Sequence, residues 1–375
     1  MSFNLNEYLE KLETLVNIDS GSRIKGGAAK VAEHMTALYE SLGLTVIKKD
    51  ADSIYGPCLE IRNQPNSPEI DILLSGHMDT VFPEGTVKER PFHIEDNFGY
   101  GPGIADMKSG LISMFYLVKF ILEEKLPISF CVALNSDEEI SSKRSQEWIK
   151  ELAKKATYAF IFEPGRKNGS YVSERKGLAR YEVKFHGIPA HAGVAPQNGA
   201  SAIHEMAAFI LEIIKLNDYA NGTSINAGIV SGGTTANVIC EYAQCQIDTR
   251  FDKIEVNKKI EETLKQLSEN PKDKRVKISV NREGFRPPMT MSEKTKELLE
   301  LMKKKAQGLN TDMTWIKTGG GSDGNFIAFE GCIVVDGVGP CGDGLHSNNE
   351  VLFLDTIESR LNILKETIKA ISYKK

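Results

Sequence analysis

No stretch of the sequence is long and apolar enough to cross a bilayer. The longest apolar run, Leu111–Leu122, contains Lys119 and is far shorter than the roughly 20 residues that a transmembrane helix needs. Residues 1–15 mix acidic and apolar side chains at helical spacing, without the basic start or apolar centre of a secretory signal. We therefore expect a folded helix at the N-terminus and no membrane-spanning segment.

The sequence also lacks an excess of charge of either sign. Its 375 residues include 46 lysines and arginines against 51 aspartates and glutamates, which gives a net charge of −5. Without a block of basic residues, nothing in the sequence favours binding to the phosphates of nucleic acid or to an anionic membrane. We expect neither partner. The 41% hydrophobic content is typical of a globular protein, and the length suggests two domains.

Cysteine is sparse, and the six cysteines form no CxxC pair. They are scattered along the chain, three of them within apolar strand-like runs. This pattern favours reduced thiols and a cytoplasmic location. No internal repeat or low-complexity tract is present.

The order of apolar patterns predicts an α/β fold with an insertion. In the first half of the chain, strand-like runs alternate with amphipathic helices, which is typical of a sheet covered by helices. From about Arg180 the order becomes β-α-β-β-α-β, the pattern of a ferredoxin-like sandwich. Pro287-Pro288 then ends this segment. We expect a doubly wound mixed-sheet domain (1–178 and 290–375) with an inserted ferredoxin-like α+β sandwich domain (179–289).

Five polar motifs lie at predicted strand ends, in glycine-rich turns or before a helix. They are SGHMDT (75–80), GPGIADMKSG (101–110), NSDEEI (135–140), IFEPG (161–165) and GDGLHSNNE (342–350). Taken singly, each has an ordinary structural explanation, such as an N-cap for Asp106 or an exposed turn for the acidic run. Because sites in open α/β sheets form at strand ends, however, the motifs jointly supply histidine and carboxylate ligands suited to zinc.

Two details of these motifs suggest separate roles for neighbouring residues. Glu138 and Glu139 should point to opposite sides if the chain there is extended, so that one can bind metal while the other transfers protons. Asp79 is placed to accept the second ring N–H of His77, as in the outer shell of many zinc sites.

In these motifs and their order, the sequence resembles the co-catalytic dizinc metallopeptidase family. That family includes glutamate carboxypeptidase, aminoacylase, acetylornithine deacetylase, succinyl-diaminopimelate desuccinylase and peptidase T, and the resemblance covers about residues 5–372. It implies that His77, Asp106 and Glu163 bind one zinc ion. It also implies that Asp106, Glu139 and His346 bind a second, so that Asp106 bridges the two Zn²⁺ ions, which Co²⁺ or Mn²⁺ could replace.

The resemblance further implies roles in catalysis. Glu138 matches the general base and Asp79 the residue that orients His77. Two Zn²⁺ ions with three carboxylates leave a charge of about +1, which one hydroxide would neutralise, so the cluster can exist in a partly dry cleft. The expected reaction is hydrolysis of an amide, in which Glu138 passes a proton from water to the leaving nitrogen. The Asp106–Met107 peptide bond is expected to be cis.

The inserted segment contains a second set of candidates. In FHGIPAHAG, His191 resembles the family's lid histidine, which stabilises the tetrahedral intermediate, whereas His186 is interpreted as structural. Arginine can bind a carboxylate through two parallel hydrogen bonds, and backbone N–H groups before a short helix can add to them. The resemblance to glutamate carboxypeptidase implies that Asn237, Arg250 and Arg286 bind the substrate, and the backbone of Gly320 and Gly321 is a further candidate.

The motifs resemble those of glutamate carboxypeptidase more than those of the deacetylases. We therefore expect an exopeptidase that releases a C-terminal amino acid from a small peptide. The alternatives are an N-acyl-amino-acid deacylase of the acetylornithine deacetylase or aminoacylase type, or a tripeptidase. The edge strands of a ferredoxin-like insert need covering, so we also expect a homodimer. The family resemblance adds that His191 reaches the partner subunit's zinc site.

Two interpretations from other functional classes compete with this one. Gly337–Gly342 satisfies the G-x-G-x-x-G pattern of dinucleotide-binding proteins, but no helix is predicted to begin there and Pro340 stiffens the turn. A family member that had lost catalysis could also bind metabolites, although every expected ligand and the expected base are present. Metal content and chelator-sensitive amide hydrolysis would exclude both.

Overall fold

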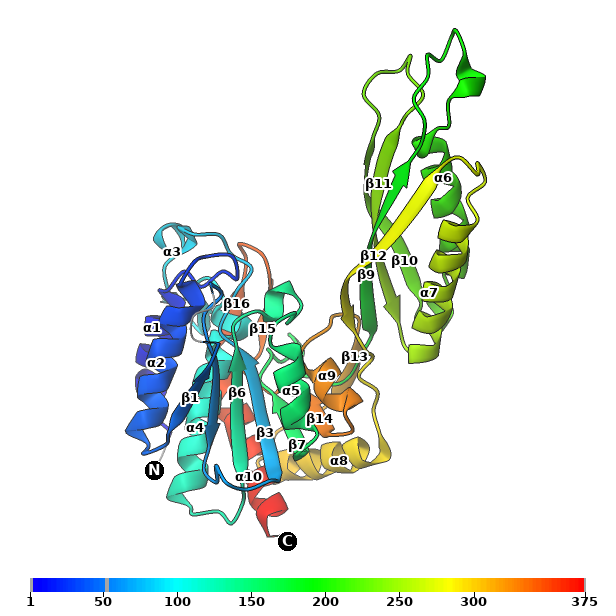
Figure 1. Cartoon of the computed structure of the whole chain (residues 1–375). Coiled ribbons are helices and arrows are strands. Elements are labelled where there is room, and N and C mark those ends of the chain that lie inside the picture. Colours follow the sequence, from blue (N-terminus) through cyan, green and yellow to red (C-terminus); the bar gives the residue numbers. More distant parts are fainter. Residues whose placement is uncertain (1–2, 51–53, 374–375) are drawn as a thin grey trace. The chain divides into compact units, whose positions relative to one another are not determined.

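The computed structural model describes residues 3–50 and 54–373 and divides the chain into two compact units (Figure 1). The first unit comprises residues 1–174, 289–318 and 322–375, and the second comprises 175–288 and 319–321. The insert thus begins at Arg175 and not at residue 179. It also includes residues 319–321, because Arg175 donates a hydrogen bond to the carbonyl of Gly320. Part of the N-terminal helix expected over 1–15 falls on residues 1–2, which lie outside the described residues.

An eight-stranded mixed sheet forms the centre of the first unit. In spatial order its strands are β1 (Val46–Lys49), β2 (Cys58–Arg62), β6 (Phe130–Asn135), β3 (Ile70–His77), β7 (Ala156–Ile161), β14 (Ile333–Asp336), β8 (Tyr171–Arg175) and β13 (Trp315–Thr318). The central strands β6, β3, β7 and β14 run parallel, whereas β2 is antiparallel to β6 and β8 to β14. The expected α/β class with a doubly wound mixed sheet is confirmed.

Helices cover both faces of this sheet because side chains alternate along each strand. Ile72 and Leu74 of β3 belong to the core on one face, and Leu73 belongs to the core on the other. The first core contains residues of α1 (Leu5–Val16), α2 (Gly27–Ser41), α4 (Ser109–Glu123), α8 (Glu293–Gly308) and α10 (Asp355–Ser372). The second contains residues of α5 (Gln146–Ala153) and α9 (Gly324–Phe329).

A small antiparallel sheet of the first unit was not predicted from the sequence. Its strands in spatial order are β15 (Gly342–Asp343), β16 (Val351–Phe353), β5 (Phe98–Tyr100) and β4 (His93–Glu95), and the short helix α3 (Thr86–Glu89) precedes them in the chain. The register pairs Leu352 with Gly99. This pairing brings the C-terminal motif next to the glycine-rich turn that precedes α4.

The second unit has the expected ferredoxin-like architecture. Its strands β9 (Gly177–His186), β10 (Ser224–Gly232), β11 (Tyr242–Phe251) and β12 (Lys277–Arg286) form an antiparallel sheet in the order β10-β11-β9-β12. Helices α6 (Ala202–Ile213) and α7 (Ile254–Glu269) contribute Phe209 and Ile260 to a core that includes Val183 and Phe185 of β9. The two edge strands are β10 and β12.

No helix begins at Gly337–Gly342. An arginine instead binds backbone carbonyls of this stretch. Arg360 of α10 is 5% exposed and donates to the carbonyls of Gly339 (2.6 Å), Gly169 (2.8 Å) and Gly337. Its guanidinium lies 3.9 Å from the ring centroid of Tyr171. After this stretch the chain enters β15, so the helix N-terminus that a dinucleotide-binding turn requires is missing.

Two further expectations concern the whole chain. No helix among the described residues has the length and apolar character needed to span a membrane. All six cysteines are buried and unpaired, as the sequence pattern predicted.

Candidate metal centre

The expected metal ligands come from turns at one edge of the large sheet. His77 is the last residue of β3, and Glu139 and Glu163 follow β6 and β7. Because these strands are parallel, their carboxyl ends meet at the same edge. Asp106 lies just before α4, and His346 lies in the loop between β15 and β16.

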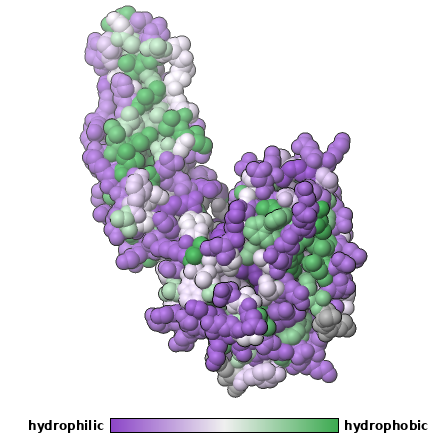
Figure 2. Space-filling view, turned by 180° about the vertical axis from the view of Figure 1, so that it is seen from behind, coloured by the Kyte–Doolittle hydropathy of each residue, from purple (hydrophilic) through white to green (hydrophobic). Residues whose placement is uncertain are grey.

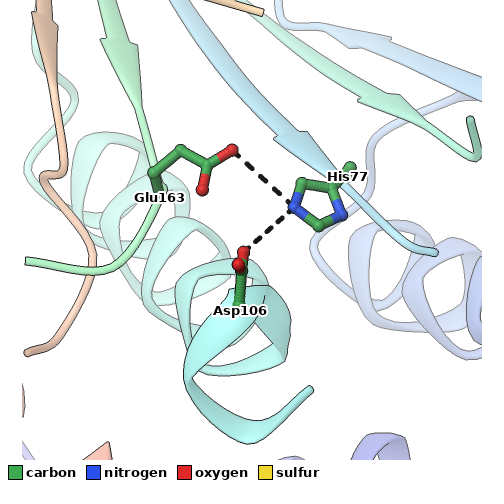
Figure 3. A group of neighbouring side chains, drawn as sticks. All are labelled: His77, Asp106 and Glu163. Atoms are coloured by element: carbon green, nitrogen blue, oxygen red, sulfur yellow. Dashed lines mark hydrogen bonds and ion pairs between the residues drawn. The ribbon is translucent and has the colours of Figure 1, made fainter. Parts of the chain in front are cut away.

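The first group consists of His77, Asp106 and Glu163 (Figure 3). The Nε2 atom of His77 lies 3.3 Å from Oδ1 of Asp106 and 3.7 Å from Oε1 of Glu163. One ligand atom from each residue lies within 4.8 Å of the other two. Both carboxylates therefore point toward the same ring nitrogen, as ligands of one cation would.

The second group consists of Asp106, Glu139 and His346. The Nε2 atom of His346 lies 3.1 Å from Oδ2 of Asp106 and 3.3 Å from Oε2 of Glu139. Asp106 thus directs one oxygen to each group. The structure brings together all five residues that the sequence proposed as ligands, in the two sets that were expected.

The electrostatics of the cluster favour a cation. Burial opposes a charge on His77, but the neighbouring Asp106, Asp79 and Glu163 carboxylates outweigh it and raise the pKa of His77 well above 6.5. Hydrogen bonds to Asp106 and Glu139 likewise raise the pKa of His346 to about 11. Burial opposes a charge on Asp106, but its hydrogen bonds and charge interactions with His346 and His77 outweigh burial and lower the pKa of Asp106 below its usual range.

A divalent metal at each group fits the donors that are present. Among the described residues, Oε1 of Glu139 is buried and has no hydrogen-bond partner. A buried carboxylate oxygen without a partner is costly unless a ligand or cation completes it. The imidazole and carboxylate donors of the two groups are those that zinc accepts.

The turn after β6 differs from the extended conformation assumed in the sequence analysis. Glu138–Ile140 forms one turn of 3-10 helix, so adjacent side chains diverge by about 120° instead of pointing to opposite sides. Glu139 joins the second group, whereas Glu138, which is 9% exposed, is in neither. The expected divergence of the two acids therefore holds, but for a different geometric reason.

Asp79 also acts differently from the expectation. Nδ1 of His77 contacts the backbone carbonyl of Asp79 at 2.9 Å, and the Asp79 carboxylate is farther away, at 3.5 Å. The carboxylate instead accepts the backbone N–H groups of Glu138 and Glu139, each at 3.2 Å, and the hydroxyl of Ser22 at 2.6 Å. Asp79 thus contacts His77 through its backbone and the acidic turn through its side chain.

The Asp106–Met107 peptide bond is cis, as predicted.

In the second unit, the candidates His191 and Asn237 lie on adjacent segments. A β-bridge joins His191 to Val238, and Ala192 donates to the carbonyl of Asn237 at 2.9 Å. Both candidate residues are exposed. Nδ1 of His191 accepts the backbone N–H of Gly193 at 3.1 Å, which places the proton of the neutral ring on Nε2.

The candidates Arg250 and Arg286 lie in one row across the sheet of the second unit. Both are paired in register with Leu178 of β9, from β11 and β12 respectively, so their side chains leave the same face. Arg250 donates to the Asp248 carboxylate (Nε–Oδ1 2.8 Å) and to the Gly319 carbonyl (3.3 Å). Arg286 is only 3% exposed.

The sequence analysis missed two buried charged residues, one in each unit. Arg175, at the end of β8, is 4% exposed and donates to the carbonyls of Gly320 (3.1 Å) and Gly321 (3.5 Å). These two glycines thus contribute carbonyls to the contact, where N–H groups had been expected to face a substrate. Glu350 closes the C-terminal motif and received no role, although an acid at the end of a glycine-rich polar loop was a visible signal.

Comparison with known proteins identifies the family. A model of the peptidase family M20/M25/M40 matches residues 73–370. The chain is also 31% identical over 366 residues to carboxypeptidase G2 from a Pseudomonas species. The matched region is 94% of this chain and 86% of that protein. The chain belongs to the peptidase family M20/M25/M40.

The chain is also similar to proteins whose names describe other activities. Succinyl-diaminopimelate desuccinylase from Ehrlichia chaffeensis is 25% identical over 320 residues, which is 80% of this chain and 81% of that protein. The crystal structure of aminopeptidase PepT from Bacillus cereus matches with a TM-score of 0.78 at 24% identity, over 98% of this chain and 99% of that one. Membership of the M20 family makes the protein a metal-dependent hydrolase and confirms the expected family and enzyme class.

We predict that ligand variants will separate the two groups. Glu163→Gln removes a donor from the first group only and Glu139→Gln from the second only, so each variant should keep one tightly bound ion of two. Asp106→Asn should weaken both sites, each by at least roughly 100-fold, because even residues outside the ligand shell affect metal affinity by 10- to 100-fold. Elemental analysis and competition with a chromophoric chelator measure both quantities.

The matched control is Asp343→Asn, because Asp343 ends β15 just before the loop that contains His346 but forms a surface ion pair with Lys167. This control should bind metal as the wild type does. If Glu163→Gln and Glu139→Gln each still bound two metal ions with wild-type affinity, the assignment of ligands to the two groups would be wrong.

Proposed function

We propose that this protein is a dizinc exopeptidase that cleaves an amide bond next to a free carboxylate and releases a C-terminal amino acid. The observation that carries the proposal is the geometry of Asp106, whose two oxygens face two separate groups of zinc-type donors. The relative at 31% identity, carboxypeptidase G2, supports a carboxypeptidase-like activity.

Two bound zinc ions would supply Lewis acidity and lower the pKa of water, so that it is a nucleophile near neutral pH. In our proposal, Glu138 accepts the proton from that water and delivers it to the leaving nitrogen. The Asp79 carboxylate accepts the backbone N–H of Glu138 and so keeps Glu138 in place. The backbone carbonyl of Asp79 contacts Nδ1 of His77 and orients its ring. His191 donates a hydrogen bond from Nε2 to the developing oxyanion.

The arginines of the second unit would bind the carboxylate of the substrate. Arg250 and Arg286 leave the same face of a sheet, and the Gly320–Gly321 segment lies within the same unit. A guanidinium pairs with a carboxylate through two charge-assisted hydrogen bonds, which discriminates an acid from its amide. In the first unit, the loops that contain Glu163 and His346 also line a cavity of about 430 Å³, which offers space for the acyl part of a substrate.

A second candidate is an N-acyl-amino-acid deacylase. It is supported by the similarity to a protein named succinyl-diaminopimelate desuccinylase, whose name describes removal of an acyl group. Both candidates use an amide next to a free carboxylate, so the proposed residues serve either one.

A homodimer in the cytoplasm completes the proposal. The edge strand β10 carries Ile229 and Val230, which are 58% and 55% exposed, and Leu211 of α6 is 62% exposed. Figure 2 shows hydrophobic surface on the second unit. Pairing two copies through this face would cover both the apolar side chains and the unpaired edge. The six buried, unpaired cysteines suit a reducing compartment.

Substrate specificity distinguishes the two candidate activities. We expect C-terminally varied dipeptides to be hydrolysed with a higher kcat/KM than N-acetyl amino acids, and the C-terminal amides of both to react at least roughly tenfold more slowly, because they lack the charge that the arginines bind. Faster release from N-acetyl amino acids would favour the deacylase. Equal rates for acids and amides would contradict the proposed carboxylate site.

The role of Glu138 can be separated from metal binding. We expect Glu138→Gln to keep the wild-type metal content while kcat falls by roughly 10²- to 10⁴-fold, since the amide cannot accept the proton. Glu139→Gln serves as the control, because it should lose metal as well as activity. If Glu138→Gln lost metal and regained activity in excess metal, Glu138 would be a ligand and not the base.

Complementation tests the dimer and the role of His191. Glu138→Ala and His191→Ala should each be nearly inactive alone. After verified subunit exchange of equal amounts, we expect roughly one quarter of wild-type activity, because half of the dimers are mixed and each has one intact site. A mixture as inactive as its parents would show that His191 does not act on the partner's site.

A further inference from the structure

Glu350 is a buried carboxylate that accepts backbone N–H groups of the turn before α4. It is 1% exposed. Its Oε1 accepts the N–H groups of Ala105 (2.9 Å) and Asp106 (3.0 Å), and its Oε2 accepts that of Gly103 (3.0 Å). Three charge-assisted hydrogen bonds therefore join Glu350 to the segment that ends in the shared carboxylate.

A lysine also binds this turn through one of its carbonyl groups and connects it to the segment that follows α1. Lys108 is 1% exposed, and its Nζ donates to the carbonyls of Pro102 (3.1 Å) and Ile18 (2.9 Å). Gly103 has a φ of +72°, and a Cβ there would lie 2.5 Å from Cγ2 of Thr80. The turn thus has no side chain at Gly103 that could fix its path, so contacts to its backbone must do so.

Glu350 also belongs to the loop that presents His346. Its own backbone N–H donates to the carbonyl of Ser347 (3.3 Å), and the next residue, Val351, begins β16 and pairs with Tyr100. One side chain therefore connects the loop of one ligand to the turn of another. His346 itself has a φ of +61°, a conformation that a non-glycine residue adopts only where surrounding contacts enforce it.

We infer that Glu350 is a positioning residue of the metal centre, which sets the orientation of the Asp106 carboxylate relative to His346. Glu350 belongs to neither candidate metal group, and it acts through the backbone of the 103–106 turn, including the N–H of Asp106. The inference rests on the proposed function, because the orientation matters only if Asp106 and His346 bind metal. Residues that orient metal ligands commonly affect metal affinity by about 10- to 100-fold.

The test uses Glu350→Gln in the full chain. Glutamine keeps the volume and one acceptor oxygen, but its NH₂ group faces a backbone N–H and cannot accept a bond from it. We expect Zn²⁺ and Co²⁺ affinity, measured by chelator competition, to fall roughly 10- to 100-fold. The visible absorption of the Co²⁺-loaded protein should also change, because it reports ligand geometry.

The matched control is Glu205→Gln in the second unit. Glu205 is 6% exposed, and its carboxylate accepts the backbone N–H groups of Lys272 (2.8 Å) and Asp273 (3.0 Å). It therefore performs the same backbone-binding chemistry in a unit that contains no candidate ligand of either group. Any loss of stability should resemble that of Glu350→Gln, but metal affinity and the Co²⁺ spectrum should match those of the wild type.

A second variant covers the case in which Glu350→Gln does not fold. Glu350→Asp keeps the charge but shortens the side chain by one methylene, so it should also lower metal affinity and alter the Co²⁺ spectrum. A folded Glu350 variant with wild-type affinity and spectrum would overturn the inference, and so would an equal loss of affinity in Glu205→Gln. Failure of the wild type to bind two ions would instead refute the proposed function, so the two failures are distinguishable.

Discussion

The candidate metal centre depends on one carboxylate that faces two histidines. Asp106 directs Oδ1 to His77 and Oδ2 to His346, while it is itself only 7% exposed. A carboxylate buried to this extent needs charged or hydrogen-bonding partners on both oxygens. Removing either histidine would leave an oxygen uncompensated, which makes Asp106 the point at which the two groups become one site.

Further buried carboxylates stabilise the turns that contain the acidic ligands. Asp79 accepts the N–H groups of Glu138 and Glu139, and Glu350 accepts those of the turn that ends in Asp106. Each turn thus has an anion bound to its backbone that is not itself in either ligand group. Networks of this kind are rigid when every member is paired, which suits a site whose ligands must remain close together despite their mutual repulsion.

The two units contain different kinds of chemistry. The candidate metal ligands and Glu138 belong to the first unit, whereas His191 and the candidate arginines belong to the second. In the proposed function, the first unit provides water activation and proton transfer, and the second recognises the substrate carboxylate and the oxyanion. Such a division would allow relatives to change substrates through the insert without disturbing the metal centre.

The sequence alone determined the α/β class and the ferredoxin-like insert, and through its motifs and the family resemblance it named the five candidate ligands that the structure brings together. These features depend on local patterns, because strand and helix periods and the types of ligand residue are visible in short stretches. The small sheet that pairs Leu352 with Gly99 was not predictable, because its strands are short and far apart in the chain. The contacts of Glu350 follow from that pairing, and the helical turn at Glu138 and the true contacts of Asp79 depend on backbone geometry that no residue type specifies. Tertiary structure decided these points because backbone N–H and carbonyl groups are the same at every residue, so only the fold determines which of them a buried carboxylate can reach.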